Sequence, residues 1–237
     1  MLNVKWRVSM AKYVLKFSKE NYFKYTSHLD LLRFFKRSFK RAGIKLNYSQ
    51  GFNPHPKMGF AQPLSLGYSS IYELLEFEVS EELSVDDVMK RLKMIMPEGL
   101  KILGCVEYRE EGRSLAALTV AAEYTIDLPF GAEAFSGKDC KEACYDFLSQ
   151  EHIFVKKKQK KSKELVEVDI KNKIKEITFA SVGERMLVHT VLDAGSESNL
   201  SPELLIEAIT TFFKQDVPRY DIEVMRKKII FSNKFTI

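Results

Sequence analysis

Apolar and polar side chains alternate along the first regular segment of the chain. Over residues 12–18, Tyr13, Leu15 and Phe17 alternate with polar side chains, and only Val14 interrupts the polar side. A period of two is typical of a β-strand with one buried face. The segment therefore predicts a strand.

A helical pattern comes next and has clear end signals. Ser27 is suited to cap its start, with Asp30 three residues on as the capping-box acid, and the pattern runs to Ala42 before Gly43 ends it. The next segments predict strand, strand, helix and strand, at 44–48, 71–79, 84–96 and 100–108. The first unit thus has the order β-α-β-β-α-β.

The same order can be read again after a connection near Gly112. The expected strands are 121–128, 152–155, 186–191 and 220–231, and the expected helices are 138–149 and 201–213, the second begun by Ser201-Pro202. Segment 156–184 then needs an extra hairpin, from 165–170 and 174–180. We predict an α+β protein of two tandem ferredoxin-like domains with antiparallel sheets, 1–110 and 111–237, and an inserted hairpin in the second.

Composition indicates a folded chain in a reducing compartment. Of 237 residues, 45% are hydrophobic and 29% charged, enough to bury real cores. No stretch approaches the roughly 20 apolar residues that cross a bilayer, so no membrane association is expected. The three cysteines, Cys105, Cys140 and Cys144, are an odd number and fit free thiols. A cytoplasmic location is expected.

The positive charge is concentrated near the N-terminus. The net charge is +5, but residues 1–50 hold 12 Lys or Arg against 2 acids, whereas 51–110 hold 6 against 10. This asymmetry suggests a polyanionic partner, although solvated lysine surfaces are also common.

Five cations share one face of the first predicted helix, opposite its apolar side. They are Arg33, Lys36, Arg37, Lys40 and Arg41. Like charges at these spacings repel, and a phosphate-bearing ligand such as RNA would relieve that repulsion. An ordinary solvated helix face explains the pattern equally well. The lysine tract at 156–163 has the same two interpretations, an RNA-binding loop or a solubilising hairpin tip.

The segment 48–57 predicts a rigid loop. Pro54 and Pro56 fix the backbone on both sides of His55 and restrict Asn53. His28, at the start of the first helix, is a plausible neighbour of that imidazole, and a shared site would place both histidines in acid-base or binding roles. The alternative for His28, on the apolar side of its helix, is ordinary packing.

Signatures of common enzymes and metal sites do not occur. Cys140 and Cys144 share a helix face, but no second pair or nearby histidine completes a zinc pattern. The closely spaced cysteine triplet of a radical-SAM enzyme, a P-loop, a dinucleotide fingerprint and a nucleophile elbow are also missing. We expect no cofactor, no metal and no activity of the chain on its own.

Several motifs together resemble the bacterial radical-SAM-linked family. They are Lys16-Phe-Ser-Lys19, Ser27-His-Leu-Asp-Leu-Leu-Arg33, Arg41-Ala-Gly43, Tyr48-Ser-Gln-Gly-Phe-Asn-Pro-His-Pro-Lys57 and Pro63-Leu-Ser-Leu-Gly67. The likeness extends over nearly the whole chain from Met10, which leaves residues 1–9 outside it.

The resemblance implies an accessory or substrate-recognition protein that works with a radical-SAM enzyme. The basic helix adds RNA as a candidate ligand. The substrate- or partner-binding residues that the resemblance implies are Ser27, His28, Asp30, Asn53, His55 and Lys57. The alternative is a metal-independent nuclease like the RAMP proteins, with His28 or His55 as catalytic base. The glycine-rich C-terminal loop typical of those nucleases is missing from 231–237.

Overall fold

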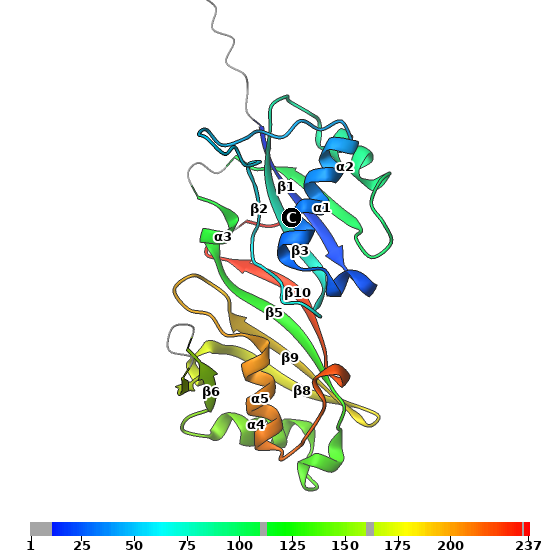
Figure 1. Ribbon diagram of the computed structural model, residues 1–237. Coiled ribbons are helices and arrows are strands. Elements are labelled where there is room, and N and C mark those ends of the chain that lie inside the picture. The colour runs from blue at the N-terminus through cyan, green and yellow to red at the C-terminus, as the bar shows by residue number, and fades with distance from the viewer. Residues whose placement is uncertain (1–10, 110–112, 160–163, 234) are drawn as a thin grey trace, which may run out of the picture. The chain divides into compact units, whose positions relative to one another are not determined.

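The computed structural model describes residues 11–109, 113–159, 164–233 and 235–237. The chain divides into two compact units (Figure 1). Unit 1 runs to Leu118 and includes the last residues from Asn233, and unit 2 runs from Thr119 to Ser232. The boundary expected from the sequence was 110/111, and the predicted connection near Gly112 lies outside the described residues.

Unit 1 has the predicted order of strands and helices. Its elements are β1 (Ala11–Lys19), η1 (Asn21–Tyr25), α1 (His28–Arg41), β2 (Met58–Phe60), β3 (Ser69–Val79), α2 (Val85–Lys93), β4 (Ile102–Glu107) and α3 (Leu115–Leu118). The strands lie in the order β4-β1-β3-β2, and every pair is antiparallel. The short helix α3 has no counterpart in the sequence prediction.

The core of unit 1 lies between its sheet and both of its longer helices. Tyr13 and Phe17, from the alternating pattern of β1, are fully buried. The ring of Phe17 lies 4.8 Å from that of Phe35 on α1, and Phe39 one turn later lies 4.6 Å from Phe77 on β3. Val88 of α2 joins the same cluster. The apolar side of α1 is therefore fixed against the sheet, and its cationic side faces away.

Unit 2 combines a main sheet with a small separate one. Its elements are β5 (Thr119–Leu128), η2 (Ala132–Phe135), α4 (Cys140–Ser149), β6 (Phe154–Lys158), β7 (Leu165–Asp169), η3 (Lys171–Lys173), β8 (Ile174–Val182), β9 (Arg185–Asp193), α5 (Pro202–Phe212), η4 (Arg219–Asp221) and β10 (Glu223–Phe231). The main sheet has the antiparallel order β10-β5-β9-β8, and β6 pairs with β7 alone. Phe147 of α4 packs against Phe179 of β8 and Phe212 of α5, so both helices share one core.

The strand predicted at 44–48 is wrong. Only isolated bridges form there, Leu46 with Val79 and Tyr48 with Pro56, and the regular strand is β2. From Tyr48 the segment no longer runs beside β3, because the chain enters the loop there. The residue opposite Tyr48 is Pro56, which has no N–H with which to extend the pairing.

The pairing assigned to the inserted hairpin is wrong, although both of its strands are present as β7 and β8. The prediction paired 165–170 with 174–180 and placed 152–155 in the main sheet, but β6 pairs with β7 and β8 joins β9. Burial explains why β8, and not β6, lies in the main sheet. β8 alternates buried Ile177 and Phe179 with exposed neighbours, whereas β6 buries only Val155. An exposed, lysine-rich strand gains little from a place in the main sheet.

The predicted helices are present, with ends that differ by at most three residues. The predicted start at Ser27 is confirmed, since its side chain accepts a hydrogen bond from the Asp30 N–H. Across the described residues, none of these helices has the length and apolar character needed to span a membrane.

Candidate functional site

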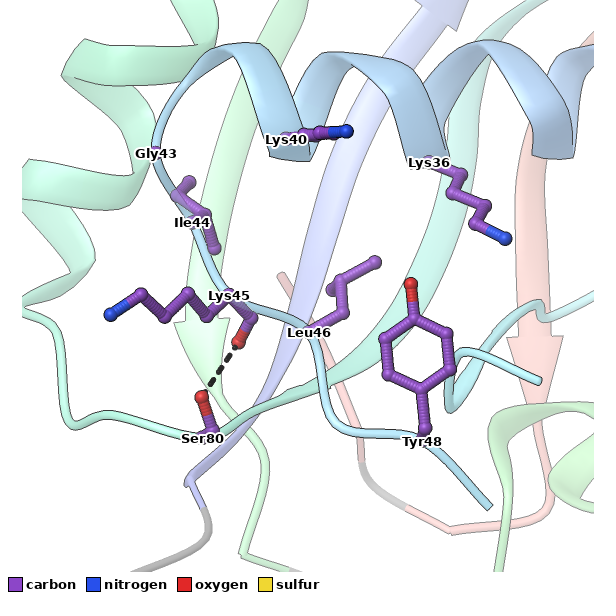
Figure 2. A pocket seen from close by; sticks show the side chains of 8 residues that line it. All are labelled: Lys36, Lys40, Gly43, Ile44, Lys45, Leu46, Tyr48 and Ser80. Atoms are coloured by element: carbon purple, nitrogen blue, oxygen red, sulfur yellow. Dashed lines mark hydrogen bonds between the residues drawn. The ribbon is translucent and has the colours of Figure 1, made fainter. Parts of the chain in front are cut away.

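A pocket of about 560 Å³ lies beside the second half of α1 (Figure 2). Its walls come from α1, from the turn after it, from the segment 44–48 and from the residue that follows β3. The lining residues are Lys36, Lys40, Gly43, Ile44, Lys45, Leu46, Tyr48 and Ser80. The pocket thus joins two regions that the sequence singled out separately, the basic helix and the start of the proline-containing loop.

The turn at Gly43 creates this arrangement. Gly43 has a φ of +69°, a left-handed conformation that glycine adopts without strain and that commonly ends helices. The next N–H, of Ile44, donates to the carbonyl of Phe39 (2.9 Å), and the Ile44 side chain is buried. The chain therefore doubles back and runs beside α1 instead of leaving it.

Backbone hydrogen bonds then fix the segment 44–48 to the end of β3. The N–H of Asn47 donates to the carbonyl of Glu78 (2.9 Å), and that of Ser80 donates to the carbonyl of Lys45 (3.0 Å). The Asn47 side-chain amide adds a bond to the carbonyl of Val79 (3.2 Å). One wall of the pocket is therefore held by the sheet and the other by the packed helix, which makes the site largely preformed.

Three lysines line the pocket together with an aromatic and apolar surface. Lys36, Lys40 and Lys45 are exposed, and none of them forms an ion pair with a carboxylate in the part of the chain that the structure describes. The Lys36 ammonium lies 5.7 Å from the centre of the Tyr48 ring, a cation–π distance. In Figure 2, Lys36 and Tyr48 approach each other from the two walls, while Lys45 lies on the other side.

The remaining cations of α1 lie outside the pocket. Arg33, Arg37 and Arg41 are exposed like the two lysines, so all five predicted cations are on the solvent side of the helix. Arg33 forms an ion pair with Asp30 (2.9 Å), one turn earlier. Lys36 and Lys40, four residues apart, are the pair that lines the pocket.

Ser27 and Asp30 are engaged in the first turn of α1. The Ser27 hydroxyl donates to the Asp30 carboxylate (2.7 Å) and accepts from the Asp30 N–H (3.2 Å). The hydrogen bond from Ser27, with that from Arg33 second, lowers the pKa of Asp30. These contacts give both residues a role in starting the helix.

His28 is half-buried at the start of α1. Its ring meets the ring of Phe60 edge-on at 5.2 Å between centres. Burial first, and the nearby charge of Lys19 second, lower its pKa below the usual 6.5. His28 is therefore neutral at physiological pH and packs on an aromatic side chain of the core.

The predicted loop closes on itself. The Ser49 N–H donates to the carbonyl of His55 (2.8 Å), and the His55 N–H donates to the Ser49 hydroxyl (3.0 Å). Asn53 and His55 are exposed, and Lys57 forms an ion pair with Glu78 (2.8 Å). Among the described residues, no hydrogen bond or ring contact joins His28 to His55 or to Asn53. The structure thus does not bring the two histidines together by a direct contact.

Three residues of interest escaped the sequence reasoning. Tyr48 and Lys45 line the pocket, and Phe52 at the tip of the loop is fully exposed. The position of Phe52 between Gly51 and the Asn-Pro pair was a signal, because a large apolar side chain in a turn has no core to enter. Lys45 and Tyr48 had no such signal, since the turn at Gly43 is what places them beside α1.

The described residues hold no group of three or more His, Cys, Asp or Glu side chains placed to bind a metal ion. Cys105, Cys140 and Cys144 are free thiols. Burial raises the pKa of the Cys105 thiol to about 12, so it stays protonated and unreactive.

The fold and the pocket define an α+β protein with antiparallel sheets and a preformed basic site. The chain belongs to the DUF2344 family, described as an uncharacterized protein conserved in bacteria, whose model matches residues 12–202. No curated protein matches the chain.

Proposed function

We propose that this protein is a non-catalytic RNA-binding accessory protein, and that the outer face of α1 with the adjoining pocket is its RNA surface. The observation that carries the proposal is that Lys36, Lys40 and Lys45 line one pocket with Tyr48 and have no carboxylate partner among the described residues. Positive charge interleaved with an aromatic ring is the combination that binds single-stranded nucleic acid.

The contrast with three paired lysines of unit 1 supports this proposal. Lys12 pairs with Glu76 (3.1 Å), Lys57 with Glu78 (2.8 Å) and Lys101 with Glu20 (3.5 Å). Lys36 and Lys40 have no such partner within the described residues, although like charges four apart on a helix repel. A phosphate backbone would relieve this repulsion and release its own counterions.

The test is RNA binding by a variant that reverses the two pocket lysines of α1. We expect Lys36→Glu with Lys40→Glu to weaken binding of a single-stranded RNA about tenfold or more, because each reversal removes a phosphate contact and adds repulsion. Electrophoretic shift or fluorescence anisotropy measures the affinity.

The matched control is Lys90→Glu with Lys93→Glu, which makes the same charge change on exposed positions of α2. Equal weakening by both double variants would show a general charge effect and contradict a defined surface. Absence of RNA binding by the unmodified protein would overturn the proposal.

The association with a radical-SAM enzyme is a further part of the proposal and rests on the motif resemblance. In the proposed association, the loop at 48–57 and the first turn of α1 bind a substrate or the partner enzyme. Co-expression of the tagged protein with the radical-SAM enzymes of the same genome tests it directly. We expect one of these enzymes to co-purify with the protein, and separate elution of all of them would contradict the association.

RNA cleavage is the outcome that would replace the accessory role. The half-buried His28 packs on Phe60, and the backbone of the exposed His55 is fixed by Ser49. Neither arrangement gives the histidine a described acid or base partner, which favours binding without cleavage. Cleavage of structured RNA in EDTA that is lost in His28→Ala or His55→Ala would contradict it.

For the fold, we propose that both units are versions of the ferredoxin-like β-α-β-β-α-β arrangement. The support is the correspondence of strand orders, β4-β1-β3-β2 in unit 1 and β10-β5-β9-β8 in unit 2, with β6 and β7 as an insertion.

A further inference from the structure

The pocket beside α1 has the dimensions of a site for one small molecule, not for a double helix. Its volume of about 560 Å³ falls within the range of small-ligand sites. Side chains read A-form duplexes across a broad, shallow minor groove, whereas the unpaired bases of single strands enter pockets. The size of the pocket therefore favours an unpaired nucleotide.

The aromatic side of the pocket offers a surface for a base. Tyr48 is 42% exposed, and Ile44 and Leu46 beside it contribute apolar surface. Its backbone is held through the bridge to Pro56 and the anchored segment before it, so little freedom is lost when a ligand binds. A flat nucleobase would stack on such a ring whatever its sequence.

Positive charge lies next to the Tyr48 ring on the helix side of the pocket. Lys36 already lies over the Tyr48 ring at 5.7 Å, and Lys40 projects from the next turn of the same helix. The Lys45 side chain runs away from Tyr48 in Figure 2, so the two lysines of α1 are the cations on the Tyr48 side of the pocket. A phosphate next to a base stacked on Tyr48 would therefore meet the ammonium groups of α1.

We propose that this pocket binds one unpaired nucleotide of an RNA chain, with its base stacked on Tyr48 and its flanking phosphates on Lys36 and Lys40. This inference rests on the proposed RNA-binding function and adds a preference to it: the protein selects single-stranded RNA over duplex through Tyr48.

The experiment compares the affinities of Tyr48→Ala and Tyr48→Phe for a fluorescein-labelled single-stranded RNA and for the same strand in a duplex. We expect Tyr48→Ala to weaken single-strand binding about tenfold, since a stacked base contributes that much, and to leave duplex binding unchanged. Tyr48→Phe keeps the ring and retains affinity.

Two control measurements separate loss of stacking from unfolding and from a general effect of removing a tyrosine. Thermal melting shows whether Tyr48→Ala is folded, and Tyr220→Ala, which removes an exposed tyrosine elsewhere, provides the matched control. Tyr220→Ala keeps the single-strand affinity if stacking on Tyr48 is specific.

Each contrary result has a distinct meaning. If Tyr48→Ala binds both RNAs as the unmodified protein does, while Lys36→Glu with Lys40→Glu does not bind, the nucleotide site is wrong and the RNA surface stands. Loss of the single-strand affinity in Tyr48→Phe as well would overturn the role of the ring. If the unmodified protein binds neither RNA, the proposed function fails and the nucleotide site with it.

Discussion

At the scale of single residues, burial separates side chains that the sequence treats alike. Phe35 is fully buried against Phe17, whereas Phe52 is fully exposed at the loop tip. The periodicity of α1 predicted the first, because the position of an apolar residue on a helix wheel decides its burial. The pocket role of Tyr48 was beyond the sequence, since it depends on a turn that brings distant positions together.

Removal of the Phe52 ring should leave the fold unchanged. We expect Phe52→Ala to change the free energy of unfolding by less than about 0.5 kcal/mol, as exposed sites do. Phe35→Ala should cost about 3–5 kcal/mol because it opens a cavity in the core. Urea denaturation measures both, and a large loss in Phe52→Ala would show that the loop tip packs against the protein.

His28 should make stability depend on pH. Its pKa in the folded protein lies below 6.5, so below pH 6.5 the unfolded chain binds more protons than the folded one. The neutral His28 ring therefore contributes fully to the free energy of unfolding above pH 6.5. This contribution is lost as the pH falls from 6.5 toward the pKa of His28 in the folded protein. Unfolding measured across this range should show a weaker pH dependence in His28→Gln, and identical profiles would contradict the shift.

At the scale of elements, local signals were sufficient for helices and insufficient for strand pairing. Ser27 and Ser201 cap α1 and α5 as the sequence indicated, and Ser84 caps α2. The strand partners of 154–158 and 174–182 depend on which segment buries more apolar surface, a property of the assembled unit. The strand prediction at 44–48 failed because Pro56, eight residues later, stands opposite Tyr48.

The cap of α1 should have a measurable effect on stability. Ser27→Ala removes the acceptor for the Asp30 N–H, so we expect a loss of about 1 kcal/mol in the free energy of unfolding. Ser65→Ala, at an exposed serine outside any helix, is the control and should have no effect. Equal effects in chemical denaturation would argue against a capping role.

At the scale of the whole molecule, ion pairing decides where the positive charge remains available. The sequence located the excess of cations in residues 1–50, and the structure shows how it is distributed. Lys12 is paired with Glu76 and lies 4.6 Å from the ring of Tyr108, while Lys36 and Lys40 have no carboxylate partner among the described residues. Charge counts predicted the region and the helical pattern predicted the basic face of α1, whereas the pocket that Lys36 and Lys40 share with Tyr48 became visible only in the structure.

The measurement that tests the central claim most directly is the salt dependence of single-stranded RNA binding, compared between the unmodified protein and Lys36→Gln with Lys40→Gln. Each phosphate contact on a single strand contributes about 0.7 to the slope of log affinity against log salt concentration. We predict that the slope of the double variant is smaller by about 1.4, while Lys90→Gln with Lys93→Gln keeps the full slope. Equal slopes for the unmodified protein and both variants would contradict the account, because Lys36 and Lys40 would then contact no phosphate.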